Sequence, residues 1–270
     1  MALGGNPVFN SKNYREQTRA AGATGAASTT YAQPMSSQAL QDMYSQPSAS
    51  PQDTGRMTYA DVINKTLLSL GLVLIGAGIG WQMSGLMLVG AIVGLVLGLV
   101  NSFKRQPSPV LIMLYAGFEG LFLGGLSRFF ENMYPGIAVQ AVLATFSVFA
   151  VTLVLYRSGK YRATPKMTRM FMIAMIGYGV FSLLNFVLMM TGTIDGMFGM
   201  RSGLLGLGIG VLAVLLATYA LVLDFTNISD GVRQGAPAKM AWSAAFGLTV
   251  TLIWLYVEIL RILAILRGDD

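Results

Sequence analysis

Residues 204–223 read LLGLGIGVLAVLLATYALVL, twenty consecutive positions without a charged side chain. An α-helix of about 20 residues is about 30 Å long, which is the thickness of the hydrocarbon core of a bilayer. The segment is therefore predicted to cross a membrane as a helix.

Six further apolar runs of similar length follow Met57 and are separated by proline, glycine and polar residues. They are residues 66–83, 86–103, 110–130, 137–156, 170–190 and 244–266. Because a lipid-embedded helix satisfies its own backbone hydrogen bonds, the pattern predicts an all-α membrane protein with seven transmembrane helices.

The composition of the whole chain supports this class. Of its 270 residues, 54% are hydrophobic and 11% are charged, against about a quarter charged in soluble domains. There is no histidine and no cysteine, which argues against histidine or cysteine catalysis, disulfides and most zinc or haem sites. We expect no enzyme, no catalytic residue, no cofactor and no small-molecule substrate. The net charge of +6 fits basic cytoplasmic loops better than nucleic-acid binding.

Residues 1–56 differ from the rest, because they are rich in alanine, serine, threonine, glutamine and glycine. Such a segment cannot bury enough apolar surface to offset its ordering entropy. We predict a disordered polar tail over 1–56 and a membrane domain over 57–270.

Basic residues are concentrated at one end of the predicted spans, which sets the orientation by the positive-inside rule. With a cytoplasmic N-terminus, the inner side holds Arg56, Lys65, Lys104, Arg105, Arg157, Lys160, Arg162, Lys166, Arg169, Arg233 and Lys239. The outer side then holds Arg128, Arg201 and Arg267, with Arg261 as a fourth candidate. Seven spans place the C-terminus outside.

Glycines at a spacing of four recur inside the apolar runs: Gly76 and Gly80, Gly90, Gly94 and Gly98, Gly120 and Gly124, and Gly206 and Gly210. Small residues let helices approach closely in a membrane, so these ridges predict helix–helix contacts. They do not match a nucleotide-binding loop, because no strand precedes them and no lysine follows.

A few polar side chains lie within the runs, where a charge at the helix centre costs about 2.5 to 3.5 kcal/mol. They are Glu119, Asp224, Glu258 and the milder Asn185. Each has a structural interpretation. Asp224 could be solvated at a helix end, and Glu258 could be neutralised by Arg261 one turn away. Glu119 could be protonated and hydrogen-bonded to another helix, and Asn185 is interpreted as an interhelical contact.

The functional interpretation joins two of these carboxyl groups. If Asp224 and Glu258 lie on adjacent helices, they would repel each other when ionised and would share a proton, which makes a pH sensor. Converging carboxylates are also ligands for Ca²⁺, so the same pair could line a calcium path.

The polar residues occur in motifs that resemble a known family. The motifs are Glu119-Gly-Leu-Phe-Leu-Gly124, Leu223-Asp-Phe-Thr-Asn-Ile228, Leu255-Tyr-Val-Glu-Ile-Leu-Arg261 and the acidic end Arg267-Gly-Asp-Asp270. Together they resemble the Bax inhibitor-1 family (transmembrane BAX inhibitor motif proteins), in its bacterial branch with an extended N-terminal tail. The resemblance implies a central seventh helix and a pH-dependent Ca²⁺ leak in the bacterial plasma (inner) membrane.

The resemblance also implies a gate. Carried over, Asp224 and Glu258 form a carboxylate pair bridged by Arg105, with Lys104 as the competing basic residue. Two departures affect this assignment: the seventh-span acid is glutamate rather than aspartate, and the loop between the two acids is longer, which leaves the depth of Glu258 open.

Two other functions compete with the leak. A non-conducting regulator would bind another membrane protein, such as a protease or a stress-response complex. An intramembrane aspartyl protease is disfavoured, because the seventh span lacks the required Gly-x-Gly-Asp sequence.

Overall fold

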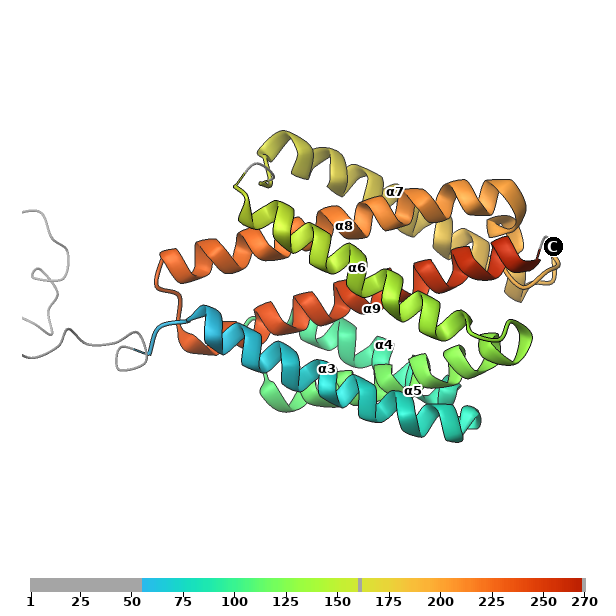
Figure 1. The fold of residues 1–270 in the computed structure, drawn as a ribbon, viewed down its shortest axis with the longest axis horizontal. Helices are drawn as coiled ribbons and strands as arrows, with labels where there is room; N and C mark the ends of the chain where they lie inside the picture. The colour runs from blue at the N-terminus through green and yellow to red at the C-terminus, as the bar shows by residue number, and fades with distance from the viewer. Residues whose placement is uncertain (1–54, 160–161, 269–270) are drawn as a thin grey trace, which may run out of the picture. The chain divides into compact units, whose positions relative to one another are not determined.

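The computed structural model describes residues 55–159 and 162–268, which form seven helices long and apolar enough to cross a membrane (Figure 1). They are α3 (Tyr59–Gln82), α4 (Met87–Phe103), α5 (Pro109–Met133), α6 (Ile137–Arg157), α7 (Pro165–Met190), α8 (Gly203–Arg233) and α9 (Ala241–Gly268). Short 3₁₀ helices are η1 (Ser84–Leu86), η2 (Gly199–Arg201) and η3 (Ala238–Met240). No strand forms within the described ranges, so the all-α seven-helix prediction is confirmed. Most of the predicted tail, 1–54, lies outside the described residues.

Helices α3 and α7 begin several residues before their apolar runs, because polar caps start them. At α3, Thr58 Oγ1 accepts a hydrogen bond from Asp61 N at 3.0 Å, and Asp61 Oδ2 accepts one from Thr58 N at 3.1 Å. This is a capping box, which satisfies two free backbone donors. At α7, Thr164 caps the helix and Pro165 occupies the first turn, where its missing N–H costs nothing.

Helix α8 continues beyond its apolar run, from Leu223 to Arg233. Asp224 therefore lies inside a helix and not at its end, which corrects the interpretation of Asp224 as a helix-end residue. The cause is that Asp224-Phe-Thr-Asn-Ile228 remains amphipathic and packs Phe225 and Ile228 into the core.

The bundle has two ends. At the N-terminal end α3 begins, and the α4–α5, α6–α7 and α8–α9 connections lie there; at the C-terminal end α9 finishes (Figure 1). The segment before α3 pairs with the α8–α9 connection: Met57 N donates to Ala236 O at 2.7 Å, and Ala238 N donates to Gly55 O at 2.8 Å. The entry to α3 is thus attached to the start of α9.

Helix α9 is the central helix, as the resemblance implied. In its apolar segment 67% of the residues are buried, whereas in α7 only 6% are. It packs against α3, α5, α6 and α8, and Leu255 and Leu260 are fully buried. In Figure 1, α9 runs between its neighbours along the length of the bundle.

The most extensive helix contact, between α3 and α5, uses the predicted glycine ridges. A Cβ added to Gly120 would lie 2.9 Å from Gly76 Cα, which is too close for two atoms that are not bonded. Only glycine lets the two backbones approach this far, which is the usual basis of tight packing between membrane helices.

Candidate functional site

Asp224 lies at the α8–α9 interface and is held by one neutral partner. Its Oδ2 accepts a hydrogen bond from Thr251 Oγ1 of α9 at 2.7 Å. On the other side, a Cβ added to Gly247 would lie 3.3 Å from Asp224 Oδ1, so the glycine leaves space beside the carboxylate. Within the described residues, no basic side chain forms an ion pair with Asp224.

A cavity of about 250 Å³ adjoins Asp224 near the N-terminal end. It is lined by Met57, Asp224, Asn227, Ile228, Gly231, Ala236, Met240, Ser243, Ala244 and Gly247. Polar side chains at Asn227 and Ser243 accompany the carboxylate. The cavity therefore presents oxygen atoms of the kind that a hydrated cation binds, and Asp224 is among its lining residues.

Glu258 has a very different environment in the half of α9 that leads to the C-terminal end. Arg201 Nη2 lies 2.9 Å from Glu258 Oε1, and Arg261 Nε lies 3.2 Å from Oε2. Arg261 Nη2 also forms an ion pair with Oε2, and the Tyr178 hydroxyl donates to Oε1. We call Glu258, Arg201, Arg261 and Tyr178 the outer cluster.

The outer cluster is deeply buried and has an excess of positive charge. The side chains of Glu258 and Arg261 are 5% and 8% exposed, and that of Arg201 is 16% exposed. Two guanidinium groups share one carboxylate, and Arg201 Nε and Arg261 Nη1 find no acceptor among the described residues. Such a cluster repels a cation, so Glu258 in this arrangement does not offer a free ligand to Ca²⁺.

Arg201 reaches Glu258 because the 3₁₀ helix η2 is fastened to α7. Asn185 Nδ2 donates to Phe198 O at 3.2 Å, and Asn185 Oδ1 accepts from Met200 N at 2.8 Å. Asn185 thus joins α7 to the short helix η2, which is a contact between helices of the kind interpreted from the sequence. Asn185 bonds to the segment that follows its own helix and so positions Arg201.

The structure does not bring Asp224 and Glu258 together as a pair. Asp224 contacts α9 at Thr251, and Glu258 lies seven residues later, about 10 Å further along the helix axis at 1.5 Å per residue. The predicted shared-proton pair is not formed in this arrangement. Because α8 extends to Arg233, the connection to η3 is only residues 234–237, shorter than the loop expected from the sequence, and Thr251, not the glutamate, faces Asp224.

The predicted basic bridge is also not formed. Lys104 and Arg105 are exposed in the α4–α5 connection, and neither forms an ion pair with a described residue. The neighbouring Gln106 accepts a hydrogen bond from Lys239 Nζ at 3.2 Å, so this connection lies beside η3 at the N-terminal end.

Glu119 lies mid-helix on α5, against α4. A Cβ added to Gly94 would be 3.0 Å from Glu119 Oε1, so the glycine of the second ridge makes room for the carboxyl group. Glu119 makes no hydrogen bond with any described residue, unlike the interhelical bond considered from the sequence.

Arg261 lies beside Glu258 at the one-turn spacing considered from the sequence. The sequence reasoning missed the roles of Arg201, Tyr178 and Thr251. A signal for Arg201 was present, because it is a basic residue just before a long apolar run on the side predicted to have few of them. Tyr178 and Thr251 stood in apolar runs with no distinguishing pattern.

No group of three or more acidic side chains gathers into a metal-binding cluster in the described part of the chain. Among known proteins, the family described as Bax inhibitor 1 like matches residues 6–268, which is nearly the whole chain. No curated protein matches the chain.

Proposed function

The chain belongs to the Bax inhibitor 1 like family of membrane proteins, and we propose that it is a pH-sensitive cation leak, permeable to Ca²⁺ and closed in the present arrangement. It would lie in a bacterial plasma membrane with its N-terminal end in the cytoplasm. The observation that carries the proposal is an open carboxylate cavity at Asp224 with a buried ion cluster about 10 Å deeper along α9.

In this proposal the two carboxyl groups have separate roles. Asp224 binds the entering cation, because it has a single neutral partner and faces a cavity. Glu258 closes the path, because its ion pair with Arg201 joins η2 to α9 and Arg261 of α9 pairs with the same carboxylate. Two guanidinium groups on the path repel a divalent cation, and opening requires that Arg201 move away with η2.

Protons act on the same two groups, since the chain has no histidine. A proton on Asp224 removes the charge that attracts the cation and lowers the flux. A proton on Glu258 removes the ion pairs of the outer cluster and releases Arg201. The net pH response depends on which carboxyl group is protonated first.

The experiment is Ca²⁺ flux into liposomes containing the full chain, measured at several values between about pH 6 and pH 8. Asp224→Asn is expected to lower the flux and to reduce its pH dependence. Arg201→Gln is expected to raise the flux, because the cluster then loses its mobile cation. Glu119→Gln is the matched control, since Glu119 faces α4 and contacts neither site. Unchanged flux and unchanged pH dependence in both test variants would overturn the proposal.

A second function is favoured by one observation, the exposure of α7. This apolar helix is largely exposed, and it contacts the bundle at α8, at η2 and through Tyr178, which reaches Glu258 and Trp254 of α9. We propose as the alternative a non-conducting regulator that binds another membrane protein through α7. If a partner co-purifies and is lost on substitution of Ile176 and Leu183 by alanine, while liposomes of the pure protein show no flux, the regulator is the correct function.

A further inference from the structure

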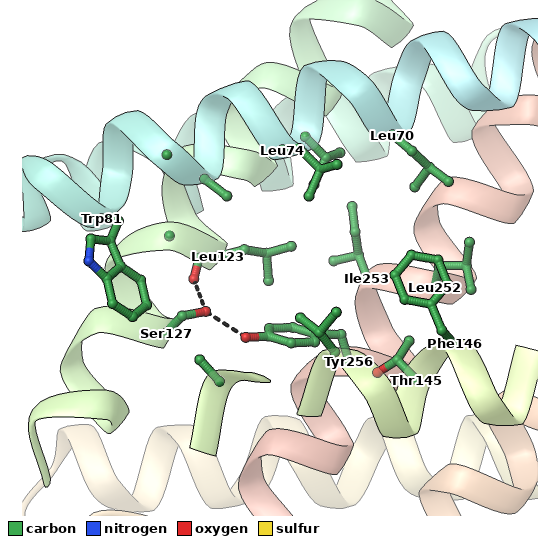
Figure 2. A pocket seen from close by; sticks show the side chains of 16 residues that line it. Leu70, Leu74, Trp81, Leu123, Ser127, Thr145, Phe146, Leu252, Ile253 and Tyr256 are labelled. Atoms are coloured by element: carbon green, nitrogen blue, oxygen red, sulfur yellow. Dashed lines mark hydrogen bonds between the residues drawn. The ribbon is translucent and has the colours of Figure 1, made fainter. Parts of the chain in front are cut away.

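An apolar groove borders the central helix and faces lipid. It has a volume of about 330 Å³ and lies between α3 and α6, with α5 and α9 as its floor (Figure 2). Leu70, Leu74 and Trp81 line it from α3, and Phe146 lines it from α6. We call it the α3–α6 groove. These two helices do not pack together along their described lengths, so the groove is open on the outside of the bundle.

The length and depth of the groove match one leaflet of a bilayer. Its α3 wall runs from Leu70 to Trp81, about 16 Å at 1.5 Å per residue, which is roughly half of a 30 Å hydrocarbon core. Trp81 is the last residue but one of α3, so the groove reaches from the middle of the bundle to its C-terminal end. An extended acyl chain of the leaflet at that end has the matching length and direction.

The chemistry of the groove also suits an acyl chain, because its hydroxyl groups are already used. Ser127 Oγ donates to Leu123 O at 2.6 Å, and the Tyr256 hydroxyl donates to Ser127 Oγ at 2.6 Å, as the dashed lines of Figure 2 show. Thr145 Oγ1 donates to Ala141 O at 2.7 Å. With these donors satisfied inside the protein, the walls favour methylene groups over water or a polar ligand.

A basic side chain stands at the open end of the groove. Arg128 follows Ser127 on α5, is exposed, and its guanidinium carbon lies 5.6 Å from the centre of the Trp81 ring. It makes no hydrogen bond or ion pair with the described residues. Glu131, one turn later, is engaged elsewhere: it accepts hydrogen bonds from Gly136 N at 2.6 Å and Ala138 N at 3.0 Å, at the start of α6. The guanidinium group is therefore available to a phosphate.

From these observations we propose that the α3–α6 groove binds one anionic phospholipid from the leaflet at the C-terminal end of the bundle. One acyl chain fills the groove between Leu70 and Trp81, and the phosphate lies on Arg128. The lipid then packs against Ile253 and Tyr256 of the central helix, so its occupancy bears directly on the element that carries Glu258.

The test is native mass spectrometry of the full chain, stripped of lipid in detergent and titrated with phosphatidylglycerol. Gly78→Phe should abolish the retained lipid, because Gly78 lines the groove and has no atom within 4 Å of an added Cβ, so the ring can enter it without moving the backbone. Gly71→Phe on the same helix is the matched control, since Gly71 is equally unobstructed and lies outside the groove. Val142→Trp, from the opposite wall, provides a second block should Gly78→Phe fail to fold.

The headgroup is tested separately. Arg128→Gln should weaken phosphatidylglycerol binding by about threefold, the effect of one partly exposed charge pair, and should leave diacylglycerol binding unchanged. Equal lipid retention in the wild type, Gly78→Phe and Val142→Trp would overturn the groove as the site. Equal loss of both lipids in Arg128→Gln would overturn the assignment of the phosphate.

Discussion

Asp224 and Glu258 are two carboxyl groups in the same bundle, about 10 Å apart in height along α9, and their surroundings are opposite. Asp224 has one hydroxyl partner and an adjoining cavity. Glu258 has two guanidinium groups and a phenol, and its side chain is 5% exposed. The difference assigns the two carboxyl groups to separate roles, cation binding and closure of the proposed path. Asp224 can exchange its hydroxyl partner for an ion, whereas Glu258 cannot do so without leaving two buried guanidinium groups unpaired.

The strongest test of the difference between the two carboxyl groups is to neutralise each of them in turn. Glu258→Gln should lower the free energy of unfolding by about 3 to 5 kcal/mol, because two buried guanidinium groups lose their counter-charge. Asp224→Asn should change it by about 1 kcal/mol or less, since the amide oxygen still accepts from Thr251. Unfolding of the purified proteins in detergent measures both. Equal losses would mean that the two sites are not distinct in the way described.

The next effect is the coupling within the outer cluster. The single variant Arg201→Gln leaves the ion pair between Arg261 and Glu258 in place. In the double variant Arg201→Gln/Glu258→Gln, the arginine substitution removes one of the two cations that Glu258→Gln leaves unpaired. The double variant should therefore be more stable than the sum of the single losses predicts, by about 1 to 3 kcal/mol. A double-mutant cycle on the same unfolding measurement gives this number. Strict additivity would show that Arg201 and Glu258 do not interact.

The smallest effect is at the partner of Asp224. Thr251→Val keeps the shape of the side chain and removes the hydroxyl that donates to Asp224 Oδ2, which should cost about 1 kcal/mol. The control is Thr226→Val on α8, whose hydroxyl bonds only to Val222 O of its own helix. The liposome flux should fall or rise only in Thr251→Val, because only this change alters the environment of Asp224. The same flux in both variants as in the wild type would argue against Asp224 as the ion site.

The fold could be predicted from the sequence because membrane helices are recognised by their length and hydropathy. The second and fourth predicted spans, 86–103 and 137–156, differ from α4 and α6 by one residue at an end. Larger errors arose where polar residues extend a helix. The start of α3 depends on the Thr58 cap, and the end of α8 lies ten residues after Leu223. Hydropathy does not detect these polar terminal turns of α3 and α8, because their side chains lie where the chain meets water.

The candidate site was only partly predictable. Spacing alone placed Arg261 next to Glu258, because both are on one helix. The neighbour of Asp224 depends on the register between α8 and α9, which the connection between them sets. The second cation of the outer cluster comes from η2, whose position depends on the hydrogen bonds of Asn185. Neither register nor loop placement leaves a periodic signal in a single sequence.

The central position of α9 has a consequence for how the protein is made. The helix around which the others pack is the seventh of the described membrane helices, so the six before it are synthesised before their common core exists. Tyr178 and Arg201 are synthesised before Glu258, so they lack their hydrogen-bond acceptor until α9 has been inserted. Glu258 arrives together with Arg261, as a prepaired unit on one helix, which reduces the cost of inserting either charge. Assembly of the seven-helix bundle is therefore completed only after α9 has been synthesised, because α3, α5, α6 and α8 all pack against it.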